Sequence, residues 1–131
     1  MEKEIWKDIE GYEGRYRVDT NGAILRLQRV VRAGTGYRLL PESIRKSHID
    51  KHGYSKVILF NGKTKKNIFI HRIVASAFVP KITGKNIVNH KDGNKLNNNH
   101  LNLEWCTVQE NTIHAYANNL IKTKKVDVTA K

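Results

Sequence analysis

Two Asn-Gly dipeptides, at positions 21–22 and 61–62, constrain the fold of this chain more than any other local feature. Asn-Gly favours the tight turn of an antiparallel hairpin, because both central residues of that turn take positive φ angles. Ahead of the first dipeptide, Tyr16 and Val18 alternate with charged residues, which is the period of a strand with one buried face. Alternating apolar residues also flank the second dipeptide. The sequence therefore predicts hairpins at about 16–27 and 54–70.

The segment after the second predicted hairpin has the periodicity of a helix. His71, Val74, Ala75 and Phe78 recur at the spacing of one helical face, and Pro80 is expected to end the helix. Because His71 opens an apolar face, we expect packing to be its role.

A second helix is predicted near the C-terminus. Thr107 and Glu110 have the spacing of a capping box, which marks a helix N-terminus. This helix is expected over 108–120, with a core stripe formed by Ile113, Ala117 and Leu120.

A short hairpin with a long loop is predicted between the two helices. Residues 87–88 form a short apolar strand, and Leu101, Leu103 and Trp105 alternate as its return strand. Residues 94–102 contain five asparagines, at 94, 97, 98, 99 and 102. This crowding indicates a loop held by side-chain hydrogen bonds to the backbone. The sequence as a whole predicts an α+β fold, in which small antiparallel hairpins lead into a strand–loop–strand–helix core.

The balance of charge points to a polyanionic partner. The chain has 24 Lys and Arg against 12 Asp and Glu, a net charge of +12 on 131 residues. We favour nucleic acid over a membrane surface. Segment 29–53 is basic without a clear period, so we expect a loop or short strand that lies on phosphates, or a plain connector. The candidate DNA contacts are Arg15, Arg17, Arg26, Arg29, Arg32, Lys63, Lys65 and Lys66.

Other features limit the class of protein. Cys106 is the single cysteine, which excludes an internal disulfide and a cysteine-rich zinc finger. No apolar run reaches the roughly 18 residues of a membrane helix, and the N-terminus lacks the apolar region of a signal peptide. We therefore expect a cytoplasmic protein without a membrane partner.

The predicted hairpin and last helix bring chemically useful side chains together. His90 ends the first strand beside Asn89, and Asn111 lies in the first turn of the helix. Mg²⁺ binds oxygen ligands and keeps several waters, so amide oxygens together with DNA phosphate oxygens would suffice to hold it. His90 could then deprotonate a water for attack on phosphorus. These groups are enough for phosphodiester hydrolysis without a covalent intermediate.

The residues of this core also resemble a known family. The run from Val88 to Asn98, followed by the run from Leu101 to Trp105 and by Asn111, resembles the HNH motif of homing-type endonucleases, which have a ββα-metal centre. Residues 5–14, with Val18 and the Asn-Gly at 21–22, resemble the NUMOD4 module that accompanies such nucleases, and residues 53–78 are also similar to the family. The resemblance covers about 4–120.

The resemblance implies a role for each residue of the motif. It implies that His90 is the general base, that Asn102 braces the loop and so orients the base, and that Asn111 is a metal ligand. The residue before the base is commonly Asp, whereas here it is Asn89, a ligand without negative charge. His114 shares the helix face of Asn111, so it is a candidate for a phosphate or metal contact.

The resemblance also implies an organisation and an activity. It implies a NUMOD4-like DNA-binding module with its basic connector at 4–53, an HNH nuclease core at 54–120 and a basic tail at 121–131. The expected activity is DNA cleavage with Mg²⁺ or Mn²⁺, on one strand or both, in the cytoplasm of a bacterial host if a phage encodes the chain. Longer members of the family carry a further C-terminal DNA-binding module. We therefore expect this chain to cover a shorter stretch of double-stranded DNA. We also expect it to act as a homodimer or with an accessory protein.

Two alternatives remain open from the sequence. The first is a DNA-binding module whose nuclease centre has degenerated, an interpretation that Asn89 supports. The second is a protein that binds or cuts RNA, because basic hairpins alone do not separate the two nucleic acids.

Overall fold

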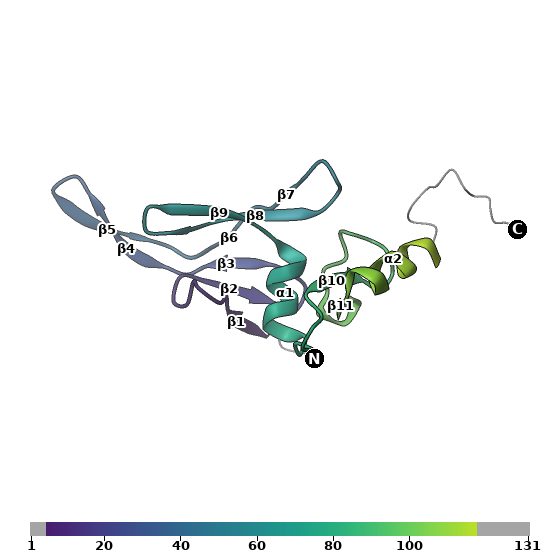
Figure 1. The fold of residues 1–131 in the computed structure, drawn as a ribbon. Helices are drawn as coiled ribbons and strands as arrows, with labels where there is room; N and C mark the ends of the chain where they lie inside the picture. Colours follow the sequence, from purple (N-terminus) through teal and green to yellow (C-terminus); the bar gives the residue numbers. More distant parts are fainter. Residues whose placement is uncertain (1–4, 118–131) are drawn as a thin grey trace, which may run out of the picture.

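The described part of the chain folds into small antiparallel sheets and two α-helices, so the predicted α+β class is confirmed. The computed structural model describes residues 5–117. The molecule is elongated: a projecting hairpin occupies one end and the last strands and helix the other (Figure 1). No helix among the described residues is long and apolar enough to cross a membrane.

The first predicted hairpin lies in a four-stranded sheet with the order β1-β2-β3-β6. Its strands are β1 (Trp6–Asp8), β2 (Tyr16–Asp19), β3 (Ile24–Arg26) and β6 (Ser43–Ile44). Gly22, in the turn between β2 and β3, has a φ of 91°. A Cβ atom at this position would lie 2.9 Å from Ile70 Cγ2, so glycine is required both by the backbone and by the neighbouring helix.

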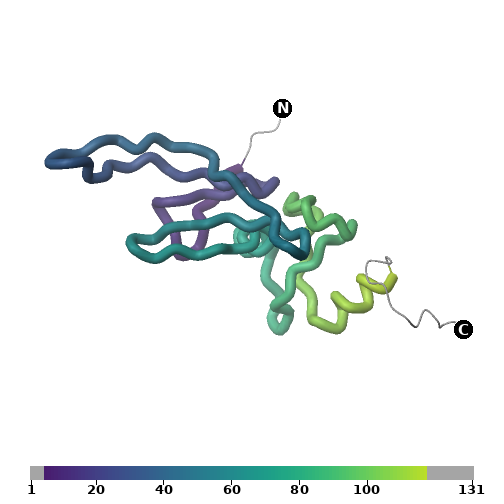
Figure 2. Tube along the Cα trace, turned by 90° about the horizontal axis from the view of Figure 1, so that it is seen from above, coloured from purple at the N-terminus to yellow at the C-terminus, as the bar shows by residue number. Residues whose placement is uncertain are grey.

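The basic segment 29–53, expected to be a loop or short strand on phosphates or a plain connector, contains a third hairpin. Strands β4 (Arg29–Ala33) and β5 (Gly36–Leu40) pair with each other and form a two-stranded sheet that projects beyond the rest of the molecule (Figure 2). Val30, Tyr37 and Leu39 are each more than half exposed. Because neither face is buried, the two strands have no alternation of apolar and polar residues, and this is why the sequence pattern missed them.

The second predicted hairpin is present with its turn shifted by one residue. It consists of β8 (Ser55–Asn61) and β9 (Thr64–Phe69), and β7 (His48–Ile49) pairs with the other edge of β8. Asn61 pairs with Thr64, so the turn is formed by residues 62–63 rather than by the Asn-Gly dipeptide. Lys63 therefore occupies the tip.

Helix α1 (Ile70–Phe78) follows directly and ends before Pro80, as predicted. It packs against β2, β8, β9, β10 and β11, and it buries Ile73, Val74 and Ala75. A single hydrophobic cluster runs from Ile9 in the N-terminal segment to Trp105. The N-terminal strands thus share one hydrophobic core with the segment that carries the motif. The boundary between two functional modules at 53/54 stays a prediction.

The last part of the chain contains β10 (Ile87–His90), η1 (His100–Asn102), β11 (Leu103–Cys106) and α2 (Val108–Ala117). Strands β10 and β11 form the predicted antiparallel pair. The expected place of Leu101 in the return strand is wrong, because this residue lies in η1 and is exposed.

The predicted core stripe of the last helix is also wrong. Ile113 is 59% exposed, Ala117 is exposed, and α2 has no buried residue. Helix α2 lies at one end of the molecule (Figure 1), and its main contacts are with β10. Leu120 and the predicted tail at 121–131 lie outside the described residues.

Candidate active site

A pocket lies where β10 meets α2, and it brings together four of the predicted site residues. Asn89, His90, Asn111 and His114 all line it, in a cavity of about 390 Å³. Asn102 does not line the pocket. Strand β10 supplies the first two residues, and α2 supplies the others from one face of its first two turns.

His90, at the end of β10, is only 5% exposed. Its Nε2 lies 2.8 Å from Oδ1 of Asn98. Since a carbonyl oxygen only accepts, Nε2 carries the proton and Nδ1 has the free lone pair. Burial lowers the pKa of His90, although the hydrogen bond with Asn98 acts in the opposite direction. The imidazole is therefore neutral at neutral pH, which is the form that a general base needs.

The pocket contains a second histidine, His71, for which the sequence predicted only a packing role. His71 lines the same pocket, and its ring centroid lies 5.1 Å from that of His90. Its Nδ1 is buried and has no hydrogen-bond partner among the described residues. Burial is the main cause that lowers its pKa to about 4, and His90 and Arg72 add to the effect. Only the helical period was visible in the sequence, and it gave no sign that His71 lies beside His90.

The loop between β10 and β11 is held by a network centred on Asp92 and Asn102. Asn102 Nδ2 donates to Asp92 Oδ1 and to the Asn97 carbonyl, both at 2.9 Å, and the Asp92 amide donates back to Asn102 Oδ1 at 3.1 Å. The amide of Asn97 contributes most to lowering the pKa of Asp92, followed by the backbone of Asn94 and the amide of Asn102. The side chain hydrogen-bonded to His90 is that of Asn98, which the sequence placed only among the loop asparagines.

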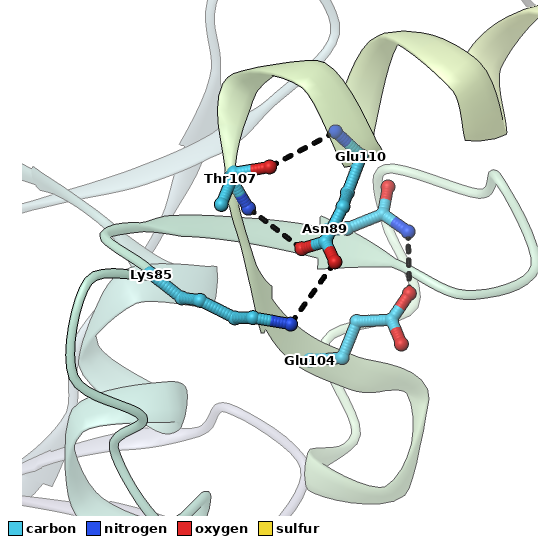
Figure 3. Close-up of polar contacts among 5 residues, drawn as sticks. All are labelled: Lys85, Asn89, Glu104, Thr107 and Glu110. Atoms are coloured by element: carbon cyan, nitrogen blue, oxygen red, sulfur yellow. Dashed lines mark hydrogen bonds and ion pairs between the residues drawn. The ribbon is translucent and has the colours of Figure 1, made fainter.

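The start of α2 positions the two helical residues of the pocket. Thr107 Oγ accepts from the Glu110 amide at 3.1 Å, and Glu110 Oε1 accepts from the Thr107 amide at 3.0 Å, so the predicted capping box is present (Figure 3). Asn111 is the residue after Glu110, and its side chain lines the pocket. His114 Nε2 donates to the Lys91 carbonyl at 2.9 Å, which ties the helix to the loop after His90.

Asn89 faces a glutamate across the β10–β11 pair. It is 7% exposed, and its Nδ2 donates to Oε2 of Glu104 at 2.8 Å (Figure 3). Glu104 is the register partner of Asn89. The sequence gave no signal for this contact, because Glu104 was visible only as a polar position within the return strand.

The donor set of the pocket fits a hard cation that keeps most of its water. The amides of Asn89 and Asn111 offer neutral oxygens, and Mg²⁺ or Mn²⁺ accepts such ligands when waters and substrate phosphates complete the shell. Among residues 5–117, no three His, Cys, Asp or Glu side chains stand close enough to bind one metal ion. A cation held here would therefore be bound by amide oxygens, with waters and phosphate oxygens completing its shell.

Basic side chains lie at the pocket and on the hairpins. Arg72 and Lys95, which the sequence did not single out, line the pocket. Of the predicted DNA contacts, Arg17 is paired with Asp8 at 3.2 Å and Arg26 donates to the Pro41 carbonyl at 2.6 Å. Arg15 is half-buried. Arg17 is exposed, and so are Arg29, Arg32, Lys63, Lys65 and Lys66.

Two family models match the chain. A model described as HNH endonuclease matches residues 68–113, which include the pocket residues on β10 and the start of α2, and the NUMOD4 motif matches residues 4–60. The chain therefore belongs to the HNH endonuclease family, with a NUMOD4 motif in its N-terminal half.

Individual relatives of the chain are named as endonucleases, and one of them as a homing endonuclease. The chain is 34% identical over 126 residues to DNA endonuclease I-HmuI of Bacillus phage SP01, an alignment that covers 96% of this chain and 66% of I-HmuI. It is 39% identical over 117 residues to HNH endonuclease L245 of Acanthamoeba polyphaga mimivirus, covering 89% of this chain and 31% of that protein. A solved structure, "DNA binding and cleavage by the HNH homing endonuclease I-HmuI", matches with a TM-score of 0.74 at 34% identity, over 93% of this chain and 63% of that one.

These relatives are longer than the chain. It spans 66% of I-HmuI and 31% of L245. The likeness establishes the family and the fold, and the activity, substrate and partners of this chain are proposals.

Proposed function

We propose that this chain is a divalent-metal-dependent DNA endonuclease of the homing type, acting at the pocket between β10 and α2. One observation carries the proposal: His90, neutral and with the Nδ1 lone pair available, shares a pocket with the amides of Asn89 and Asn111. I-HmuI, by its name a DNA endonuclease, supports DNA as the substrate.

In the proposed reaction, a water molecule attacks the phosphorus atom of a DNA phosphodiester. Nδ1 of His90 takes the proton that the water releases, the bond from phosphorus to one deoxyribose oxygen breaks, and the leaving oxygen is protonated from solvent. Asn98 holds the imidazole in the tautomer that leaves Nδ1 available, and the network around Asn102 holds the loop that carries Asn98. Asn89 and Asn111 would hold a Mg²⁺ or Mn²⁺ ion, which supplies stabilisation of charge on the phosphate and on the leaving oxygen.

The positions of the basic side chains suggest which residues would contact DNA phosphates. Arg72 and Lys95 at the pocket would hold the phosphate to be cut, and the exposed basic residues of the hairpins would contact DNA phosphates at a distance from it. On this proposal residues 4–53 serve mainly for DNA binding and residues 54–120 mainly for cleavage. A monomer with one such centre nicks one strand, whereas cutting both requires a dimer or a second event.

The test uses a pool of supercoiled plasmids with random inserts, so that a sequence-specific enzyme meets its site. We expect nicked circles with Mg²⁺ or Mn²⁺, none with EDTA, and a loss of rate of about 100-fold or more for His90→Ala, since a general base contributes roughly 10² to 10⁴. Gel-shift measurements should show that His90→Ala still binds DNA. Nicked circles formed equally well by His90→Ala would overturn the assignment of the base.

A DNA-binding module without cleavage is the second candidate, because Asn89 presents an amide at the pocket where the family commonly has a carboxylate. DNA binding by the wild type with no metal-dependent cleavage of the plasmid pool would favour this candidate and overturn the proposed enzyme.

A further inference from the structure

Asn89 and Glu104 lie opposite each other in the β10–β11 pair, and this pairing has chemical consequences. As register partners their side chains lie on the same side of the two-stranded sheet. The Asn89 amide nitrogen donates to Oε2 of Glu104 at 2.8 Å, and Figure 3 shows the Asn89 oxygen directed away from Glu104.

The carboxylate determines which way the amide is oriented. An ionised carboxylate only accepts hydrogen bonds, so an amide that faces it presents the NH₂ group. Asn89 is buried and lines the pocket, whereas Glu104 does not line it. With the nitrogen held by Glu104, the oxygen of Asn89 is the atom left for the pocket.

We propose that Glu104 is a positioning residue that makes Asn89 an effective metal ligand in place of a carboxylate. Glu104 orients the Asn89 oxygen toward the cation and supplies, one hydrogen bond behind the ligand, the negative charge that a neutral amide lacks. Groups that hydrogen-bond to metal ligands commonly change metal affinity by about 10- to 100-fold. This inference rests on the proposed function, because it assumes a divalent cation at the pocket.

The neighbouring carboxylates are engaged elsewhere, which singles out Glu104. Glu110 is paired with Lys85 at 3.0 Å and caps α2 through Thr107 (Figure 3). Asp92 accepts hydrogen bonds from its own loop. Glu104 forms no salt bridge with another of the described residues, so its charge is not neutralised by a neighbouring cation in this part of the chain.

The first test measures binding of Mn²⁺ alone to the full chain, by the loss of the electron paramagnetic resonance signal of free Mn²⁺. Glu104→Gln removes the charge and allows the Asn89 amide to turn over, so we expect the Mn²⁺ dissociation constant to rise by about 10-fold or more. Glu42→Gln is the control: it makes the same chemical change at an exposed side chain that does not line the pocket. We expect its dissociation constant to stay within about twofold of the wild type.

The second test exchanges the two groups. Asn89→Asp alone places a second carboxylate against Glu104, and like charges at this distance favour protonation of one of them, so we expect no gain in Mn²⁺ affinity. The double variant Asn89→Asp with Glu104→Gln restores one carboxylate paired with one amide, now with the carboxylate at the pocket. We expect it to recover the affinity that Glu104→Gln loses.

The outcomes separate this inference from the proposed function. Wild-type protein that binds Mn²⁺ and nicks DNA, together with a Glu104→Gln variant of equal affinity, would overturn the role of Glu104 alone. A folded double variant that binds no better than Glu104→Gln would also overturn it. Wild-type protein that neither binds Mn²⁺ nor nicks DNA would overturn the proposed function itself.

Discussion

Burial of His71 should make the folded protein less stable in mild acid by an amount that the structure determines. The side chain is 8% exposed between Tyr54, Phe69 and His90, and burial lowers its pKa to about 4. In the unfolded chain its pKa returns to about 6.5. Between these values the unfolded state binds more protons than the folded state, so stability rises with pH across this window and is lost as pH falls.

The size of the effect follows from the two pKa values. The whole gap corresponds to about 3 kcal/mol, of which about 2 kcal/mol is lost between pH 7 and pH 5. The assay is urea denaturation of the wild type and of His71→Phe at pH 7, 6 and 5. Phenylalanine keeps an aromatic ring among its neighbours but does not titrate, so the wild type should lose about 2 kcal/mol more than the variant over this range. Parallel pH dependence of the two proteins would refute the conclusion that burial keeps His71 neutral.

Two further predictions concern residues that hold the site in place. Asn98→Ala removes the acceptor of the buried His90 Nε2–H, so we expect a loss of stability of about 1–3 kcal/mol, together with slower cleavage at unchanged DNA affinity; cleavage at the wild-type rate would contradict the role of Asn98 in orienting the base. Gly22→Ala introduces a Cβ 2.9 Å from Ile70, whereas Gly62→Ala has a similar positive φ and nothing within 4 Å. In urea denaturation we expect Gly22→Ala to cost at least about 1 kcal/mol more than Gly62→Ala, and equal costs would show that the contact with Ile70 is relieved by movement of the helix.

Much of the architecture was predictable from the sequence because its signals are local. The period of α1, the capping box of Thr107 and Glu110, and the hairpins with alternating strands each depend on residues within a few positions of one another. The turn between β8 and β9 was displaced by one residue, because the pairing of whole strands decides the register and the dipeptide alone does not.

Contacts between distant residues were decided by the tertiary structure alone. The β4–β5 hairpin has no buried face and hence no period, and α2 buries no side chain although its sequence contains Ile113. His71 was read as a packing residue because a helical period reports which residues share a face but not what that face meets. Its neighbour His90 comes from a strand 19 residues away, brought there by the packing of α1 on β10.

The segment from Asn89 to Asn111 shows both what the sequence determined and what only the tertiary structure decided. The order of residues from Asn89 to Asn111 determined which groups were available: the imidazoles of His90 and His100, several amides, and no carboxylate at the position before His90. Only the antiparallel register of β10 and β11 placed Glu104 against Asn89. Strand pairing depends on which faces of the whole sheet are buried, and this is a property of the assembled core, which no short run of sequence contains.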